Sequence, residues 1–436
     1  MINYLRFVLV AGAAAISASP LSAADLKPLL DGSTLWAQNR DAFAKQGRQL
    51  GFVWTSDQHD SSRSDLGSLT FLDERVYEVV ARFDGEALKK VTVLFYGRGD
   101  AGDLDKNAFE ALLRKTIGNL DTFTGKKFTA RGKDATNAVK ADGVTWQTAD
   151  SLFTLEYSFT KENKAKQQEY RAEFIRLEIT PPAAEAKGFA SASAGKPVIG
   201  ARGDLKTRVT HDEASGDVFI GSVPMVDQGQ KGYCAVACAE RMLRYYGVDA
   251  DANEIAQAAN TKTEGGTSSR EMVEALKNLT ARFRVRTQSV EDMTTQEYIR
   301  LANDYNRNAK KAKKPLVNLD TRMVDVGEMY DAMDGEVLKE TRCKSAASTA
   351  RFLREVQSSI DAGRPLVWSV HLGFFPEPGV PQSGGGHMRL IIGYNPKTNE
   401  IIFSDSWGAG HEKKRMPLDN AWTMTVGLTA MFPFGA

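Results

Sequence analysis

The chain has 436 residues, of which 42% are hydrophobic and 25% charged, and this composition excludes collagen-like, coiled-coil and wholly disordered proteins. It holds 56 Lys and Arg against 55 Asp and Glu, and without residues 1–24, where Arg6 is the one charged side chain, the two signs balance. A neutral chain lacks the basic excess that phosphates or anionic membrane surfaces attract, so we expect neither nucleic acid nor a membrane surface as a partner.

The N-terminus has the pattern of a secretory signal peptide. Arg6 precedes an apolar run, residues 7–16, and small residues follow up to Ala24, with Ser22 at the third position back from the expected cleavage after Ala24. The alternative is a membrane anchor, but the run has about half of the ~20 residues that a spanning helix needs. No Cys follows the run, so a lipoprotein anchor is not indicated. We therefore expect a protein of the bacterial periplasm or the extracellular space, without a membrane anchor after cleavage.

Residues 25–180 are predicted to form a separate α+β domain with an antiparallel sheet. One helix is expected at 106–120, and strands are expected where apolar and polar residues partly alternate, at 76–83, 91–96, 144–147, 152–159 and 172–179. The glycine-rich segment 97–102 lacks the spacing of a phosphate-binding loop and is interpreted as a hairpin turn. Nothing in this domain indicates chemistry, and its role is left unassigned.

Residues 181–200 are rich in Ala, Ser, Gly and Pro and carry no periodicity, which indicates a linker between two domains. A long surface loop inside one domain is the alternative.

Residues 201–436 are predicted to form a second α+β domain, with helices first and a sheet afterwards. The first expected helix is 234–246, which Gly247 closes, and a second begins after Asp251. A third is expected from Ser268 or Ser269 to Leu279, and two more at 295–310 and 349–362. The expected strands are 282–290, 365–372, 387–394 and 400–405.

The three cysteines, Cys234, Cys238 and Cys343, are too few for a disulfide framework, and at least one of them must be unpaired. A bond between Cys238 and Cys343 is possible in an oxidising compartment, but a sequence gives no distance. Cys234 follows a glycine-interrupted loop and begins a predicted helix, where the positive end of the helix dipole favours the thiolate. Cys234 is therefore a candidate nucleophile.

A thiolate nucleophile needs a base, and His387 is the best placed of the five histidines. It follows three glycines and begins a predicted strand, and the next strand ends at Asp405 after a tight turn. Asp405 would then lie beside His387 and accept a hydrogen bond from its ring. His411 is a candidate for lining the cleft. No Cys and His residues have the spacing of a metal site, so neither a metal nor a cofactor is expected.

These residues resemble the papain-like cysteine peptidases. Gln228-Gly229-x-x-Gly232-x-Cys234 matches their Gln-Gly-x-x-Gly-x-Cys loop, His387 their strand histidine, and Asp405-Ser406-Trp407-Gly408 their Asn-Ser-Trp-Gly. The likeness covers roughly residues 220–436 and is nearest the bacterial peptidases related to the double-glycine leader peptidases. It implies a papain-like fold in which Cys234 is the nucleophile, His387 the general base and acid, Asp405 its orienting group and Gln228 the oxyanion donor. Trp407 would shield the bond between His387 and Asp405.

The sequence departs from papain in two places: Ala235 stands where papain has Trp, and Asp405 replaces Asn. The extra negative charge should favour a thiolate–imidazolium pair.

The expected function is that of an exported cysteine peptidase acting on a peptide or protein. The alternatives are a transglutaminase-like acyltransferase or amidase, and a catalytically silent peptide-binding scaffold. The N-terminal domain could be an inhibitory prosegment or a substrate-docking module, and residues 263–266 and 374–376 are candidates for the cleft walls.

Overall fold

The structure is a computed structural model that describes residues 23–131, 141–162, 169–182, 203–229, 233–248, 251–259, 285–319, 322, 324–382 and 384–433. The predicted signal peptide up to residue 22, the linker from 183 onward, the helix that begins at Ser268 or Ser269 and the candidate cleft wall 263–266 lie outside the described residues. Within the described part, no helix combines the length and the apolar character needed to cross a membrane.

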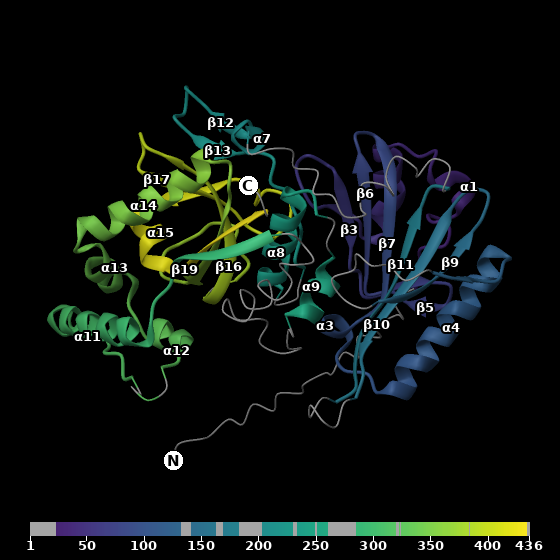
Figure 1. Cartoon of the computed structure of the whole chain (residues 1–436), viewed down its shortest axis with the longest axis horizontal. Helices are drawn as coiled ribbons and strands as arrows, with labels where there is room; N and C mark the ends of the chain where they lie inside the picture. The colour runs from purple at the N-terminus through teal and green to yellow at the C-terminus, as the bar shows by residue number, and fades with distance from the viewer. Residues whose placement is uncertain are drawn as a thin grey trace, which may run out of the picture.

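The N-terminal half is built on an antiparallel sheet, as predicted (Figure 1). In spatial order its strands are β2 Val53–Trp54, β3 Ser61–Ser64, β6 Glu78–Asp84, β7 Ala87–Gly97, β11 Arg171–Thr180, β10 Leu152–Thr160, β9 Asp142–Gln147 and β8 Thr129–Ala130. Buried residues alternate with more exposed ones along β6, which is why period-two patterning located this strand. The predicted strands 76–83, 91–96, 144–147, 152–159 and 172–179 all have counterparts here.

Helices and a small second sheet complete this half. The small sheet joins β1 Ala24–Asp25, β4 Leu69–Phe71 and β5 Glu74–Arg75, and the helices are α1 Gly32–Leu35, α2 Arg40–Gly47, the 3-10 turn η1 Arg48–Leu50, α3 Arg98–Ala101 and α4 Lys106–Thr124. The predicted helix 106–120 is therefore confirmed. The hairpin turn expected at 97–102 is wrong: α3 leads from β7 into α4, because turn-forming glycines suit a strand-to-helix connection equally well.

The C-terminal half contains a second antiparallel sheet. Its strands, in spatial order, are β12 Val209–His211, β13 Val218–Ile220, β16 Gly385–Asn395, β15 Leu366–Leu372, β19 Thr425–Pro433 and β14 Val285–Glu291, and β16 also pairs with β17 Glu400–Ser404, which pairs with β18 Lys414–Pro417. The helices are α7 Gly203–Lys206, α8 Cys234–Tyr245, α9 Ala252–Ala258, α11 Thr295–Ala312, α12 Val326–Asp331, α13 Gly335–Cys343, α14 Ala346–Asp361 and α15 Leu418–Met424. The last segment had been expected to contain only strands and turns, so α15 is a correction.

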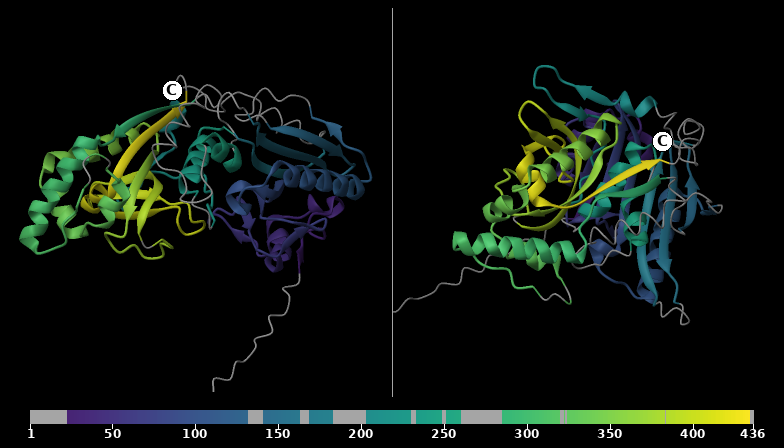
Figure 2. Two further views of the ribbon diagram at one scale, coloured as in Figure 1. Left: turned by 90° about the horizontal axis from the view of Figure 1, so that it is seen from below. Right: turned by 60° about the vertical axis from the view of Figure 1, so that its left-hand side comes forward.

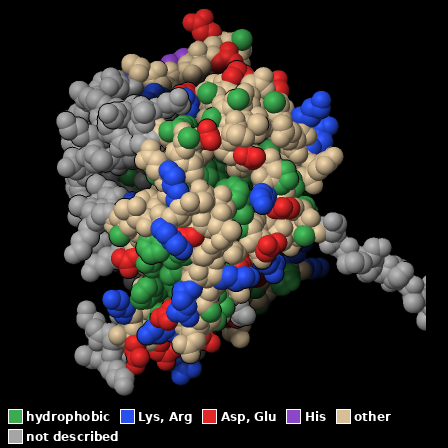
Figure 3. All heavy atoms as spheres, turned by 90° about the vertical axis from the view of Figure 1, so that its right-hand side faces the viewer, with side chains coloured by type: hydrophobic (Ala, Val, Ile, Leu, Met, Phe, Trp, Pro, Cys, Tyr) green, Lys and Arg blue, Asp and Glu red, His purple; other side chains and the backbone are tan. Residues whose placement is uncertain are grey.

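The two halves have separate hydrophobic cores, one around each large sheet. Figures 1 and 2 show α8 and α9 in the region between the two sheets, with α11 to α14 on the far side of the C-terminal sheet. Each half combines helices with an antiparallel sheet, and the predicted α+β fold class is confirmed. Figure 3 shows acidic and basic side chains intermingled on the outer face of the N-terminal half.

Candidate active site

Cys234 is the first residue of α8, at the end of the helix that lies between the two sheets. Tyr233 occupies the N-cap position and makes no side-chain capping bond, so no cap side chain satisfies the N–H groups of the first turn. Such N–H groups can bind an anion, and the helix dipole adds positive potential there. Cys234 is partly exposed, whereas Cys238, one turn later, is buried.

His387 and Asp405 lie side by side on neighbouring parts of the sheet, as predicted. His387 is on β16 and Asp405 directly follows β17, and the His387 Nε2 and Asp405 Oδ1 atoms are 2.6 Å apart. Neither side chain is exposed to solvent. Among the described residues, His387 Nδ1, the nitrogen that Asp405 does not engage, has no hydrogen-bond partner, and Cys234 lies close enough to the ring for its charge to raise the pKa of His387. The structure therefore brings Cys234, His387 and Asp405 together.

Electrostatics at this site favour a protonated imidazole. Burial by itself lowers the pKa of His387, but the hydrogen bond that its ring donates to Asp405, its interaction with Cys234 and the charges of both residues outweigh burial and raise that pKa to about 9. For Asp405, burial acts to raise the pKa, whereas the hydrogen bond and charge of His387 and the charge of Arg389 hold it below its usual value. The ring is therefore a cation, and Asp405 an anion, across the neutral pH range.

Two buried arginines support this arrangement, and the sequence analysis missed both. Arg389, two residues after His387 on β16, has its Nε 2.7 Å from Asp405 Oδ2 and its Nη1 2.7 Å from Glu377. Arg241, seven residues after Cys234 on α8, donates to the backbone oxygens of Asp405 at 3.0 Å and Pro224 at 2.8 Å. The signal was available in principle, because residues two apart on a strand or seven apart on a helix share a face.

Gln228 lies on the loop that precedes α8 and is fixed by Ser406. Its backbone N–H donates to the Ser406 carbonyl at 2.8 Å, and its side-chain Oε1 accepts from the Ser406 hydroxyl at 2.6 Å. Since the amide oxygen is engaged, the amide nitrogen is left to donate elsewhere. Gln230, the other glutamine of the loop, lies outside the described residues.

Trp407 covers His387, and its ring stacks on the imidazole with centroids 4.2 Å apart and planes 4° from parallel. His411 contacts the other edge of Trp407, while His371 lies on β15 and pairs with Asp331 at 2.9 Å. Phe374, a candidate for the cleft wall, packs instead against Tyr330 and His371.

The two remaining cysteines do not form the disulfide that was considered possible, because both are free thiols. Cys238 lies one turn after Cys234, is fully buried and donates to the Met388 carbonyl at 3.3 Å. Burial raises its pKa well above the usual value, which suits an inert thiol. Cys343 faces the Asp419 carbonyl at 3.7 Å.

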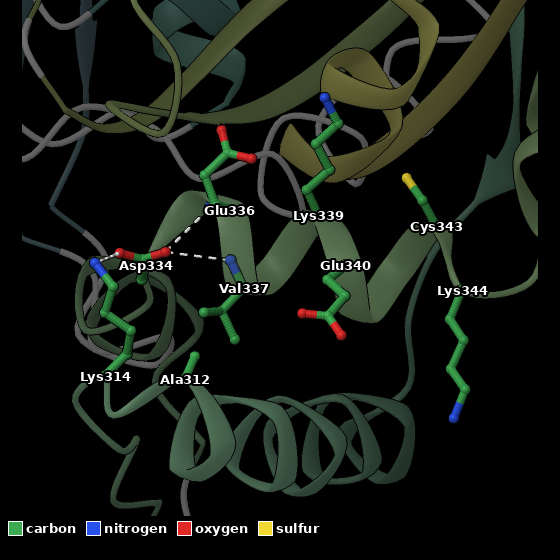
Figure 4. A pocket seen from close by; sticks show the side chains of 9 residues that line it. All are labelled: Ala312, Lys314, Asp334, Glu336, Val337, Lys339, Glu340, Cys343 and Lys344. Atoms are coloured by element: carbon green, nitrogen blue, oxygen red, sulfur yellow. Dashed lines mark hydrogen bonds and ion pairs between the residues drawn. The ribbon is translucent and has the colours of Figure 1, made fainter.

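Cys343 also borders a groove of about 850 Å³ beside α13, shown in Figure 4. Its charged side chains are of both signs, and it contains none of the residues Gln228, Cys234, His387 or Asp405. The groove is thus separate from the candidate site. Among the described residues, no group of three or more His, Cys, Asp or Glu side chains could hold a metal ion.

Comparison with known proteins gives one family match. Residues 220–429 match the model of the Peptidase_C39 like family. No curated protein matches the chain. Among solved structures, the peptidase domain of Streptococcus ComA is similar at 13% identity with a TM-score of 0.24, covering 48% of this chain and 96% of that domain. Xylellain, a cysteine protease from Xylella fastidiosa, is similar at 12% identity with a TM-score of 0.28, covering 54% of this chain and 90% of that protein. The family match lies on the segment that carries the Gln, Cys, His and Asp motifs, and it confirms the resemblance of residues 220–429 to the papain-like peptidases of the C39-related type.

Proposed function

We propose that this protein is an exported cysteine peptidase that hydrolyses peptide bonds through Cys234, His387 and Asp405, with Gln228 as an oxyanion donor. The observation that carries the proposal is the convergence of the Cys234 thiol and the Asp405 carboxylate on one buried imidazole. The export rests on the signal pattern of residues 1–24, and the substrate class on the resemblance to C39-like peptidases.

The reaction begins from a thiolate on Cys234 and a protonated ring on His387. The thiolate attacks the peptide carbonyl carbon, and the carbonyl oxygen becomes an oxyanion that the Cys234 backbone N–H and the Gln228 amide stabilise. His387 then donates its proton to the leaving amine as the C–N bond breaks, and a thioester remains. The neutral ring next accepts a proton from water, whose oxygen attacks the thioester. Release of the acid restores the thiolate and the imidazolium.

Asp405 keeps the His387 ring in one orientation and one tautomer throughout this cycle. It accepts the Nε2–H hydrogen bond, so the proton that moves is the one on Nδ1, the ring nitrogen that has no hydrogen-bond partner among the described residues. Trp407 stacks on the ring, which keeps water from this hydrogen bond and strengthens it.

A digest of a peptide library by the full chain tests the proposal, with Cys234→Ala as the inactive control and mass spectrometry as the readout. We expect cleavage by the wild type alone. Products extended by an added amine, with little hydrolysis, would instead identify an acyltransferase. Absence of any products, together with alkylation of Cys234 no faster than that of free cysteine, would identify a silent scaffold.

A further inference from the structure

One contact of the N-terminal half with the candidate site is a hairpin, formed by β2, β3 and their connecting loop. In that loop, the Asp57 backbone N–H donates to the Glu412 carboxylate at 2.7 Å. Glu412 lies on the same loop as Trp407, which stacks on His387. On β3, Arg63 lies against the loop of Gln228. The hairpin thus contacts both loops that flank Cys234.

Arg63 covers the backbone at Gly229, the residue directly after Gln228. Its Nη1 is 3.8 Å from the Asp227 carboxylate, and a Cβ placed on Gly229 would overlap its Nη2 atom. Gly229 has φ of +64°, a conformation that side chains other than glycine rarely adopt. The Gly229 N–H donates to the Asp227 carboxylate at 2.9 Å, so the charge of Arg63 acts on a tight turn centred on Gln228.

Arg63 is held in place by its own domain. Its guanidinium pairs with Glu78 on β6 and with Asp65 at 3.1 Å, and its side chain is 6% exposed. A buried guanidinium with several carboxylate partners has a fixed position, because moving it would leave charges unpaired. Arg63 therefore presents a rigid surface to the Gln228 loop.

The Gln228 loop consequently has two fixed points from opposite sides of the molecule. Ser406, in the loop that follows β17, binds both the backbone and the side-chain amide of Gln228. Arg63, from the N-terminal domain, fixes the turn formed by Asp227 and Gly229. A catalytic donor must be held within a fraction of an ångström of its place, so loss of either support should reduce its effect.

We propose that Arg63 is a positioning residue for Gln228, and that the N-terminal domain is a part of the working site. This inference rests on the proposed peptidase function. This role of the N-terminal domain differs from the two that the sequence suggested. If the domain were an inhibitory prosegment, weakening its contacts would raise the activity. If it were a docking module, weakening its contacts would change only the KM for large substrates.

A matched control lies in the same interface. Arg82 on β6 forms an ion pair with Glu240 of α8 at 3.4 Å, and so connects the same two domains. Arg82→Met therefore removes an ion pair between the two halves that ends on α8 and not on Asp227.

The experiment compares Arg63→Met, Arg63→Lys and Arg82→Met in the full chain. It measures kcat and KM on a peptide found in the library digest, the rate of Cys234 alkylation by iodoacetamide, and hydrogen exchange of peptides covering residues 225–229. We expect Arg63→Met to lower kcat by roughly tenfold to a hundredfold with KM little changed, since loss of a whole oxyanion donor costs about 10²- to 10³-fold. Alkylation should stay near the wild-type rate, because that reaction forms no oxyanion. Exchange at 225–229 should rise, and Arg63→Lys should restore part of kcat.

A second variant protects the test against misfolding. Arg63→Met leaves Glu78 buried without its partner, whereas Arg63→Met with Glu78→Gln removes both charges of that pair. Wild-type kcat and exchange in either folded variant, an equal loss of kcat in Arg82→Met, or a gain of activity would overturn the proposal. If the wild type cleaves no peptide, the proposed function fails, and the exchange of residues 225–229 still decides whether Arg63 positions the loop.

Discussion

Replacing Asp405 by Asn removes the charge that Asp405 places beside His387. Asn has nearly the same shape, and its carbonyl oxygen can still accept the hydrogen bond from Nε2, but its NH2 group then faces the Arg389 Nε that Oδ2 binds in the wild type, so Arg389 loses its partner as well. In the wild type, burial alone would lower the pKa of His387, and Asp405 leads the groups that raise it from 6.5 to about 9. That rise corresponds to about 3 kcal/mol in favour of the charged ring.

We expect Asp405→Asn to lower the pKa of His387 by roughly one unit or more. The ring must be protonated to serve the leaving amine, and a raised pKa keeps it protonated up to about pH 9, above which this function is lost. The alkaline limb of kcat/KM should therefore lie near pH 9 in the wild type and move to lower pH in the variant. The same linkage makes the ring's contribution to folding stability complete below about pH 6.5 and lost as pH rises through about 9.

The assay is a pH profile of peptide hydrolysis, supported by NMR titration of the His387 ring. Asp331→Asn is a matched control, since Asp331 pairs with another buried histidine, His371, away from Cys234. An alkaline limb that stays in place in Asp405→Asn, or a wild-type ring that titrates near its ordinary value, would refute the electrostatic reasoning.

Two further substitutions test the proposed oxyanion donor, Gln228, and the buried cation, Arg389. Gln228→Ala should lower kcat by about 10²- to 10³-fold while Cys234 alkylation stays near the wild-type rate; equal losses in both reactions would show that Gln228 supports the thiolate and not the oxyanion. Arg389→Met removes the cation beside Asp405 Oδ2 and should destabilise the fold by about 3–5 kcal/mol. Arg389 helps to hold the pKa of Asp405 low, and a lowered carboxylate pKa gives stability that is lost as pH falls, so acid unfolding of this variant should begin at a higher pH than in the wild type. Unfolding curves that match the wild type at every pH would count against that role.

The sequence was sufficient for the strongly patterned elements and for the residues of the candidate site. Strands such as β6 and β10 alternate buried and exposed residues, and α8 begins at its predicted residue and is followed by Gly247 with φ of +75°. A hairpin places the ends of its two strands beside each other, so the proximity of His387 and Asp405 followed from local pairing alone. The glycines at 97–102 led to the wrong prediction of a hairpin turn, because their backbone freedom does not specify whether a strand or a helix follows them.

Only the tertiary structure revealed the buried charges and the contact between the domains. Arg63, Arg241 and Arg389 look like solvated side chains in a sequence, since an arginine is rarely buried without a partner and no local pattern marks the partners that these three have in the fold. Arg63 and Asp227 are separated by the whole N-terminal sheet, and no periodicity links them. Local patterns determine which elements form, because they depend on neighbours along the chain. The contacts that hold the candidate site in place join residues that are distant in the sequence, such as Arg63 and Asp227, and they form only when the two halves of the chain pack together.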